Sequence, residues 1–160
     1  MKRTLIFGLV CGLLGFVAGN AFWYLASPLW IDREVSESFV ATDTTRVLAS
    51  GTFSGADAVH QGRGQAQVID TGGGQIIRFT DFEVTNGPDL YVWLVRDGGL
   101  QSSADVKGSE WLELGLLKGN IGDQNYALPA GTDLSAYKSV VVWCKQFGVL
   151  FASAEFGPAS

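Results

Sequence analysis

Two side chains in this sequence have the chemistry of a redox or nucleophilic site, Cys144 and His60. Cys144 lies in the apolar stretch at residues 139–156 and is the only cysteine besides Cys11 in the N-terminal segment. An accessible lone thiol can cycle through sulfenic acid or form a mixed disulfide with a partner. His60, the only histidine, lies in a glycine-rich turn and could act as a base for Cys144. The alternatives are a buried cysteine that packs as a small hydrophobe and a turn histidine bonded to backbone.

Aromatic residues and one lysine form a second group of candidates. The aromatic side chains could relay electrons or line a cofactor pocket, although such residues more often pack in a core. Lys118 lies in a glycine-rich loop, which we interpret as a structural feature of the fold or a binding rim, because the phosphate-loop pattern is absent. These candidates are Tyr91, Trp93, Trp111, Trp143, Lys118 and Tyr126.

Metal and haem sites are not expected within one copy of the chain. His60, Cys144 and Met1 are too few for the usual three or four zinc ligands, and they do not suggest a pair of axial haem ligands. We therefore predict no metal and no resident cofactor, and the sequence leaves open a cofactor that is shared with a partner.

The element that must position Cys144 is a β-hairpin. Two apolar runs, residues 140–144 and 149–156, flank Gln146-Phe147-Gly148, and a short glycine-containing connection between such runs indicates a hairpin. Alternation predicts two faces for the first strand: Val140, Val142 and Cys144 on one, and Val141, Trp143 and Lys145 on the other. Because both runs are almost entirely apolar, we expect a central hairpin that is buried on both faces.

Further strand signals predict an all-β domain. Alternating or apolar runs at residues 65–71, 75–84, 90–95, 112–117 and 125–128 are separated by turn clusters, with Ile77, Phe79 and Phe82 pointing inward. This pattern is typical of an antiparallel β-sandwich or barrel-like domain of about eight strands. We assign residues 50–157 to this domain, 32–49 to a polar linker and 1–31 to an N-terminal segment.

The N-terminal segment has the character of a membrane anchor. Residues 4–31 carry no charge and exceed the roughly 20 residues that span a bilayer core. Lys2 and Arg3 before it predict a single-pass protein with a cytoplasmic N-terminus and a domain outside, in the periplasm or at the cell surface. Gly19-Asn20-Ala21 resembles a signal-peptide cleavage site, so a cleaved signal is the alternative. The length of the apolar run, which continues past these residues, favours an anchor.

Four glycines of this segment share one helical face. Small residues at this spacing let membrane helices approach closely, so a homodimer is one hypothesis. Glycine is also simply common in membrane helices, and we favour that interpretation. The residues are Gly8, Gly12, Gly15 and Gly19.

The net negative charge of the chain beyond Lys2 and Arg3 disfavours some classes of partner for the domain. Beyond Lys2 and Arg3 the chain has nine basic and 16 acidic residues, a net charge of −7. Such a balance disfavours nucleic acid and an anionic membrane surface as partners of the domain.

Several motifs occur together in an order that one family shares. They are Gly51-Thr52-Phe53, then His60, Gly87-Pro88-Asp89-Leu90-Tyr91-Val92, the run LGLLKGNIGDQNYALP at residues 114–129, and Val142-Trp143-Cys144-Lys145. From about residue 51 to residue 156 the sequence resembles DM13 domains, which are β-rich extracytoplasmic modules. The resemblance implies an electron-transfer or redox role centred on Cys144, with His60 as a helper and a redox partner protein in the cell envelope.

Two functions from different classes remain open. No complete set of nucleophile, base and orienting group is present, so we favour an electron carrier over an enzyme. The alternative is a non-catalytic surface domain that binds a protein or small ligand, with Cys144 in its core. A redox role requires a reachable Cys144 sulfur, whereas a binding domain permits its burial and predicts an exposed aromatic patch or an apolar cleft.

Overall fold

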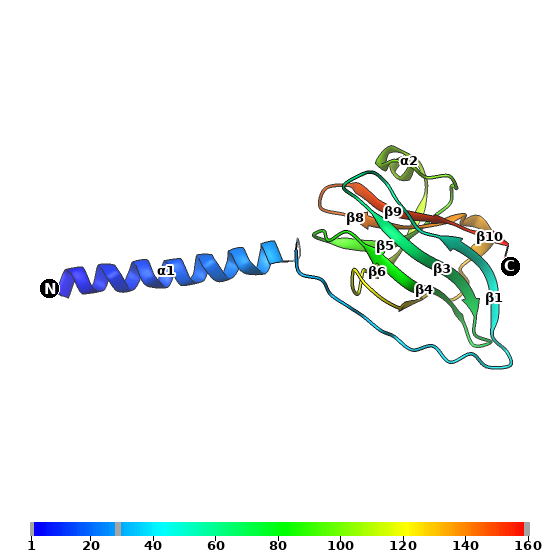
Figure 1. Cartoon of the computed structure of the whole chain (residues 1–160), viewed down its shortest axis with the longest axis horizontal. Helices are drawn as coiled ribbons and strands as arrows, with labels where there is room; N and C mark the ends of the chain where they lie inside the picture. The colour runs from blue at the N-terminus through cyan, green and yellow to red at the C-terminus, as the bar shows by residue number, and fades with distance from the viewer. Residues whose placement is uncertain (1, 28–29, 159–160) are drawn as a thin grey trace. The chain divides into compact units, whose positions relative to one another are not determined.

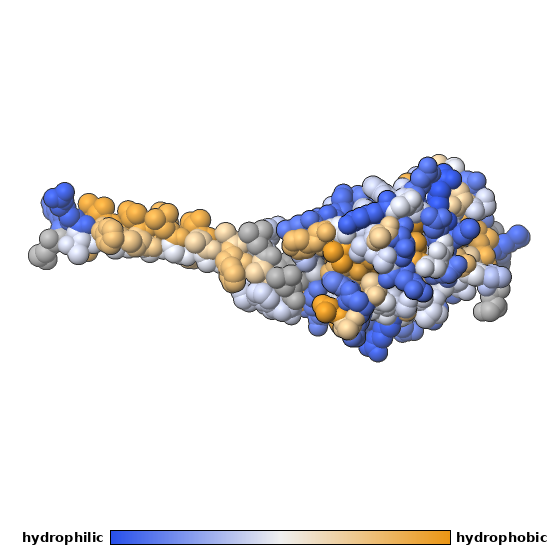
Figure 2. All heavy atoms as spheres, turned by 90° about the horizontal axis from the view of Figure 1, so that it is seen from above, coloured by the Kyte–Doolittle hydropathy of each residue, from blue (hydrophilic) through white to orange (hydrophobic). Residues whose placement is uncertain are grey.

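The structure, a computed structural model of the chain, describes residues 2–27 and 30–158 (Figure 1). It has two compact units, Met1–Ile31 and Asp32–Ser160, which are described separately. The first contains helix α1 (Lys2–Ala26), which is long and apolar enough to cross a membrane over Lys2–Tyr24. Figure 2 shows the apolar side chains along this helix. A single N-terminal apolar helix before the β domain is therefore confirmed.

The second unit is an antiparallel β-sandwich. Its first sheet has the strand order β10-β1-β3-β4-β7, and its second sheet has the order β2-β9-β8-β5-β6. The strands are β1 (Arg46–Thr52), β2 (Ser54–Gly55), β3 (Gly62–Asp70), β4 (Gln75–Val84), β5 (Leu90–Val95), β6 (Trp111–Leu116), β7 (Gln124–Ala127), β8 (Ser139–Cys144), β9 (Val149–Glu155) and β10 (Gly157–Pro158). The all-β prediction is confirmed, and the strands beyond the expected eight are the two-residue β2 and β10.

The predicted central hairpin is β8 and β9. Every residue of β8 is buried, and β8 pairs with β5 on one side and with β9 on the other. The connection ends at Gly148, whose φ of +63° suits glycine, and the Gly148 N–H donates to the carbonyl oxygen of Cys144 at 2.8 Å. A central strand of this kind holds its side chains rigidly.

Alternation divides the buried residues between two cores. The core between the sheets contains Cys144 together with Phe79, Phe82 and Val142. A smaller core on the outer face of the second sheet contains Trp93, Val141, Trp143, Leu100, Val106 and Leu150. Helix α2 (Ser103–Gly108), which the strand pattern does not predict, supplies Val106 to this outer core. Ser102 and Asp105 cap its start reciprocally.

Residues 32–39, within the predicted linker, contact the sandwich. The N–H of Val35 donates to the carbonyl oxygen of Ile121 at 2.9 Å, and the N–H of Glu37 donates to that of Asp123, also at 2.9 Å. Further along, β1 begins at Arg46, before the predicted domain start at residue 50. Polar composition did not reveal these contacts because backbone groups make them.

Candidate functional site

Cys144 ends β8 and lies inside the sandwich. Its exposed fraction is 0%, and its S–H donates to the carbonyl oxygen of Pro88 at 3.1 Å. In the sheet, Leu90 lies opposite Cys144 on β5, and Val149 lies opposite it on β9. The thiol is therefore a small buried group with one polar partner among the described residues.

The turn at residues 85–89 covers this thiol. Asp89, with an unusual φ of +56°, accepts a hydrogen bond at 3.1 Å from the N–H of Lys145. Gly87 lies so close to the ring of Phe151 that a Cβ added there would meet the ring at 2.5 Å. The turn is thus closely packed and follows directly after β4.

A β-bulge explains why Phe151 reaches this turn. The pairing of β8 with β9 shifts between Val142 and Trp143, so that Ala152 and Leu150 have partners and Phe151 is the extra residue. Phe151 and Ala152 consequently both contribute to the core between the sheets, which strict alternation forbids. The bulge re-aims Phe151 toward the end of the sandwich that holds the 85–89 turn.

His60 lies near the same end, bound to Asp57. Its Nδ1 lies 2.8 Å from Oδ2 of Asp57, and its ring centroid lies 4.4 Å from that of Phe151. Asp57 also accepts the N–H groups of Val59 and His60 at 2.8 Å and 2.7 Å. The hydrogen bond from the His60 side chain, helped by these N–H groups, lowers the pKa of Asp57 to about 2.

The structure links His60 with Cys144 only indirectly. The His60 ring packs on Phe151, Phe151 packs under the turn, and the turn accepts the Cys144 S–H through Pro88. No hydrogen bond within the described chain joins the imidazole to the thiol. His60 is therefore held by Asp57 rather than placed as a base for Cys144.

Three predicted aromatic candidates lie together on the outer face of the second sheet. The ring of Trp93 stacks on that of Trp143, with centroids 5.2 Å apart, and on that of Trp111, with centroids 3.9 Å apart. Nearby, Nζ of Lys145 lies 4.1 Å from the centroid of the Tyr91 ring. Trp93 and Trp143 point away from Cys144 because the side chains of β5 and β8 alternate between the two faces of the sheet.

Lys118 and Tyr126 lie in a different part of the sandwich. Nζ of Lys118 binds the Glu37 carboxylate at 2.7 Å and 2.9 Å, and the carbonyl oxygen of Asn125 at 2.6 Å. The Tyr126 hydroxyl donates to Oε1 of Gln124 at 2.7 Å and accepts the Lys118 N–H at 3.1 Å. Burial raises the pKa of Tyr126. These contacts fasten residues 32–39 and the loop before β7.

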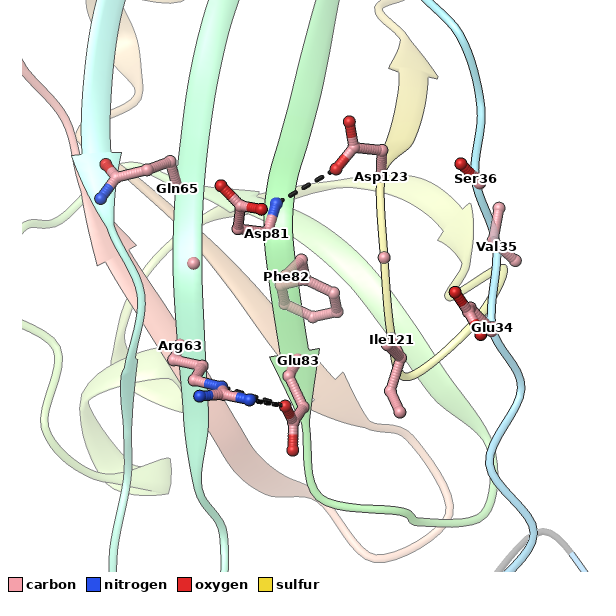
Figure 3. Close-up of a pocket in the computed structure, with 12 residues that line it drawn as sticks. Glu34, Val35, Ser36, Arg63, Gln65, Asp81, Phe82, Glu83, Ile121 and Asp123 are labelled. Atoms are coloured by element: carbon pink, nitrogen blue, oxygen red, sulfur yellow. Dashed lines mark hydrogen bonds and ion pairs between the residues drawn. The ribbon is translucent and has the colours of Figure 1, made fainter.

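A shallow polar groove of about 660 Å³ lies between residues 34–36 and the first sheet (Figure 3). Arg63 pairs with Glu83 in it, and Asp123 accepts the backbone N–H of Asp81 at 3.1 Å. None of the predicted site residues lines this groove. Among its charged groups, Arg63 and Glu83 pair with each other, whereas Asp123 pairs with Arg78, which does not line the groove.

The part of the sandwich that contains this buried thiol lies within a match to one protein family. The family model described as Electron transfer DM13 matches residues 52–156. The chain belongs to the DM13 family. The matched DM13 region contains Cys144, His60 and the whole tryptophan stack. Comparison with curated proteins and comparison with solved structures found no match.

Several contacts of this DM13 domain were not predicted from the sequence. Asp57 precedes His60 by three residues, a spacing that suits an Asx turn and could have indicated their contact. Ser102 and Asp105 have the capping-box spacing that marks a helix start. No sequence signal points to Pro88 or Phe151, because the first acts through a carbonyl group and the second through a bulge.

Proposed function

We propose that this protein is a membrane-anchored electron-transfer module whose domain lies outside the cytoplasm and whose redox group is Cys144. Membership of a family described as electron transfer carries the proposal. Helix α1, with Lys2 and Arg3 at its start, supports an anchor whose N-terminus is cytoplasmic. Cys144 is the only thiol of the sandwich, since the other cysteine of the chain is Cys11 in α1.

Thiol–disulfide exchange with an envelope protein is the chemistry that a lone cysteine supports. The Cys144 thiolate attacks one sulfur of a partner disulfide, a new S–S bond forms, and the other partner sulfur leaves as a thiolate. A dithiol of a second envelope protein, the electron donor, then attacks the Cys144 sulfur of the mixed disulfide, and the first partner leaves as a dithiol. The second thiol of the donor attacks in turn, which regenerates the Cys144 thiol and leaves the donor as a disulfide. Each cycle passes two electrons through protein thiols and needs no resident cofactor.

Exchange at Cys144 requires the 85–89 turn to open, because the sulfur has no exposed surface. Two polar contacts hold the turn to the β8 end, those of Pro88 with the Cys144 thiol and of Asp89 with the Lys145 N–H. Local opening of a surface turn costs less free energy than global unfolding. A partner that binds the open turn would therefore gain access to the thiol without unfolding the sandwich.

Glutathione disulfide tests this proposal directly. The full chain with Cys11→Ser, in detergent micelles, is incubated with glutathione disulfide and analysed by intact-mass spectrometry. We expect one added glutathione per chain under native conditions, and none in the matched Cys11→Ser/Cys144→Ser control. Addition only at denaturant concentrations that unfold the domain would overturn the proposal.

The complete burial of Cys144 favours a second candidate function. In this alternative the domain is a non-catalytic binding module, Cys144 is a core residue, and a partner docks elsewhere on the sandwich. Trp111, which is 47% exposed, offers an aromatic contact for such a partner. An unchanged partner complex in Cys144→Ser, combined with loss of the complex in Trp111→Ala, would favour this function.

A further inference from the structure

The three tryptophans of the sandwich form one stack across three neighbouring strands. Trp93 on β5 lies between Trp111 on β6 and Trp143 on β8, at interplanar angles of 9° and 29°. Aromatic pairs usually have centroids about 4.5–7 Å apart, and Trp93 and Trp111 are closer, at 3.9 Å. Their π systems therefore overlap over most of their area.

The stack connects the surface with the interior. Trp111 is 47% exposed, whereas Trp93 and Trp143 are 5% and 4% exposed. The other described tryptophans, Trp23 and Trp30, belong to the N-terminal unit. An external molecule can thus meet this stack face to face only at Trp111.

We propose that the stack carries single electrons, with Trp111 as the point where they enter and leave. This inference rests on the proposed electron-transfer function but not on Cys144. A partner's strongly oxidising one-electron acceptor, of the class of high-valent metal or organic radical centres, takes one electron from Trp111 and is itself reduced. Trp93 then supplies an electron to Trp111, and the positive charge moves inward. A one-electron donor of the ferrous or cuprous class restores the electron, and no bond is made or broken.

The surroundings of Trp93 favour a radical cation that keeps its N–H proton. Its Nε1 is buried and has no hydrogen-bond partner within residues 2–27 and 30–158. An oxidised indole becomes a neutral radical when its N–H proton passes to an acceptor. Because Trp93 has no such acceptor, the oxidised form keeps its proton and remains a radical cation that exchanges an electron with its neighbours.

Lys107 on α2 limits how far the charge travels. Its Nζ lies 5.8 Å from the centroid of the Trp143 ring. A cation over an indole is attracted to the neutral ring and repelled by an oxidised one. The positive charge is therefore concentrated on Trp93 and Trp111 rather than on Trp143.

Flash oxidation of the full chain in detergent micelles tests the stack. The background variant Trp23→Phe/Trp30→Phe removes the tryptophans of the N-terminal unit, and photogenerated tris(bipyridine)ruthenium(III) is the oxidant. Transient absorption separates the indole radical cation from the neutral radical. We expect a long-lived radical cation in the background variant. Phe147→Leu, which removes an exposed aromatic residue outside the stack, should behave identically.

Two variants separate entry from transfer. With Trp111→Phe the rate constant of oxidation should fall about tenfold, in line with exposed fractions of 47% and 5%. With Trp93→Phe oxidation should stay fast, but the radical on Trp111 should deprotonate and appear as the neutral form. Circular dichroism confirms that each variant is folded. An unchanged rate in Trp111→Phe, or an unchanged radical in Trp93→Phe, would overturn the inference.

Cys144→Ser in the same background separates this inference from the proposed function. If the radical is unchanged in Cys144→Ser and no glutathione adds to Cys144 in the folded protein, the electron-carrying role of the stack is supported and the redox role of Cys144 is refuted. If Cys144 is glutathionylated but no radical cation forms in the stack, the redox role of Cys144 is supported and the role of the stack is refuted.

Discussion

The S–H of Cys144 donates a hydrogen bond to the carbonyl oxygen of Pro88, 3.1 Å away, from a side chain with no exposed surface. This bond joins the end of a central strand to the turn that covers it. The thiol therefore packs in the core and also holds the turn in place through this hydrogen bond. The two roles lead to separate predictions about stability and about access.

Cys144→Ala should lower the free energy of unfolding by about 1–3 kcal/mol, because it removes the thiol donor of the half-buried Pro88 carbonyl and leaves a small cavity at a buried position. Urea unfolding followed by circular dichroism measures this loss. Cys11→Ala, in the separate helix α1, is the control and should leave the urea midpoint of the sandwich unchanged. An equal midpoint for Cys144→Ala and wild type would contradict the buried hydrogen bond.

Gly87→Ala should raise the reaction rate of Cys144 with an alkylating agent. A Cβ at this position would meet the Phe151 ring at 2.5 Å, so the turn must move away from Phe151 and uncover the thiol more often. Gly73→Ala is the matched control, since a Cβ there meets no atom within 4 Å. Equal rates in both variants would show that the turn does not control access.

His60→Ala should raise the pKa of Asp57 from about 2 toward 3.8, because the hydrogen bond from the His60 side chain is the largest cause of its lowering. A carboxyl with a lowered folded-state pKa stabilises the fold fully above its unfolded value. That contribution disappears as the pH falls from 3.8 toward 2. Carbon-detected NMR titration of Asp57 measures the pKa. A value near 2 in His60→Ala would refute the role of the imidazole.

Glu37→Gln should loosen residues 32–39 from the sandwich. Burial opposes ionisation of Glu37, but hydrogen bonds from Lys118 and Asn125 outweigh it and lower its pKa, so the carboxylate binds these groups at neutral pH. The partners are about one-third exposed, so solvent screening limits the loss to about 1 kcal/mol or roughly fivefold faster amide exchange at Val35. Glu34→Gln, at an exposed position, should leave this exchange unchanged.

Alternation and turn chemistry predicted the parts of the fold that local sequence controls. The placement of Cys144 and Trp143 on opposite faces of β8 follows from a period of two, and the structure shows that the Cys144 face lies between the sheets. The hairpin follows from Gly148 between two apolar runs. The same reasoning placed Ile77, Phe79 and Phe82 in the core, where they are fully or almost fully buried.

The contacts that could not be predicted from the sequence depend on the pairing register of strands far apart in the chain. Trp93 and Trp143 stack because β5 and β8 are neighbours in one register, and Trp111 joins them from β6 across a further pairing. Phe151 reaches the turn through a bulge, and residues 32–39 attach through backbone groups together with the Glu37 carboxylate, which binds Lys118. None of these relationships has a local sequence signature, because each depends on residues far apart in the chain.

The rate of Cys144 alkylation as a function of denaturant tests the central claim most directly. The folded full chain with Cys11→Ser is labelled for timed intervals at increasing urea and analysed by mass spectrometry. Opening of the 85–89 turn exposes little surface, so the account predicts slow labelling in water that hardly changes at low urea. Labelling that is absent in water and rises only with global unfolding would contradict it and make Cys144 a core residue.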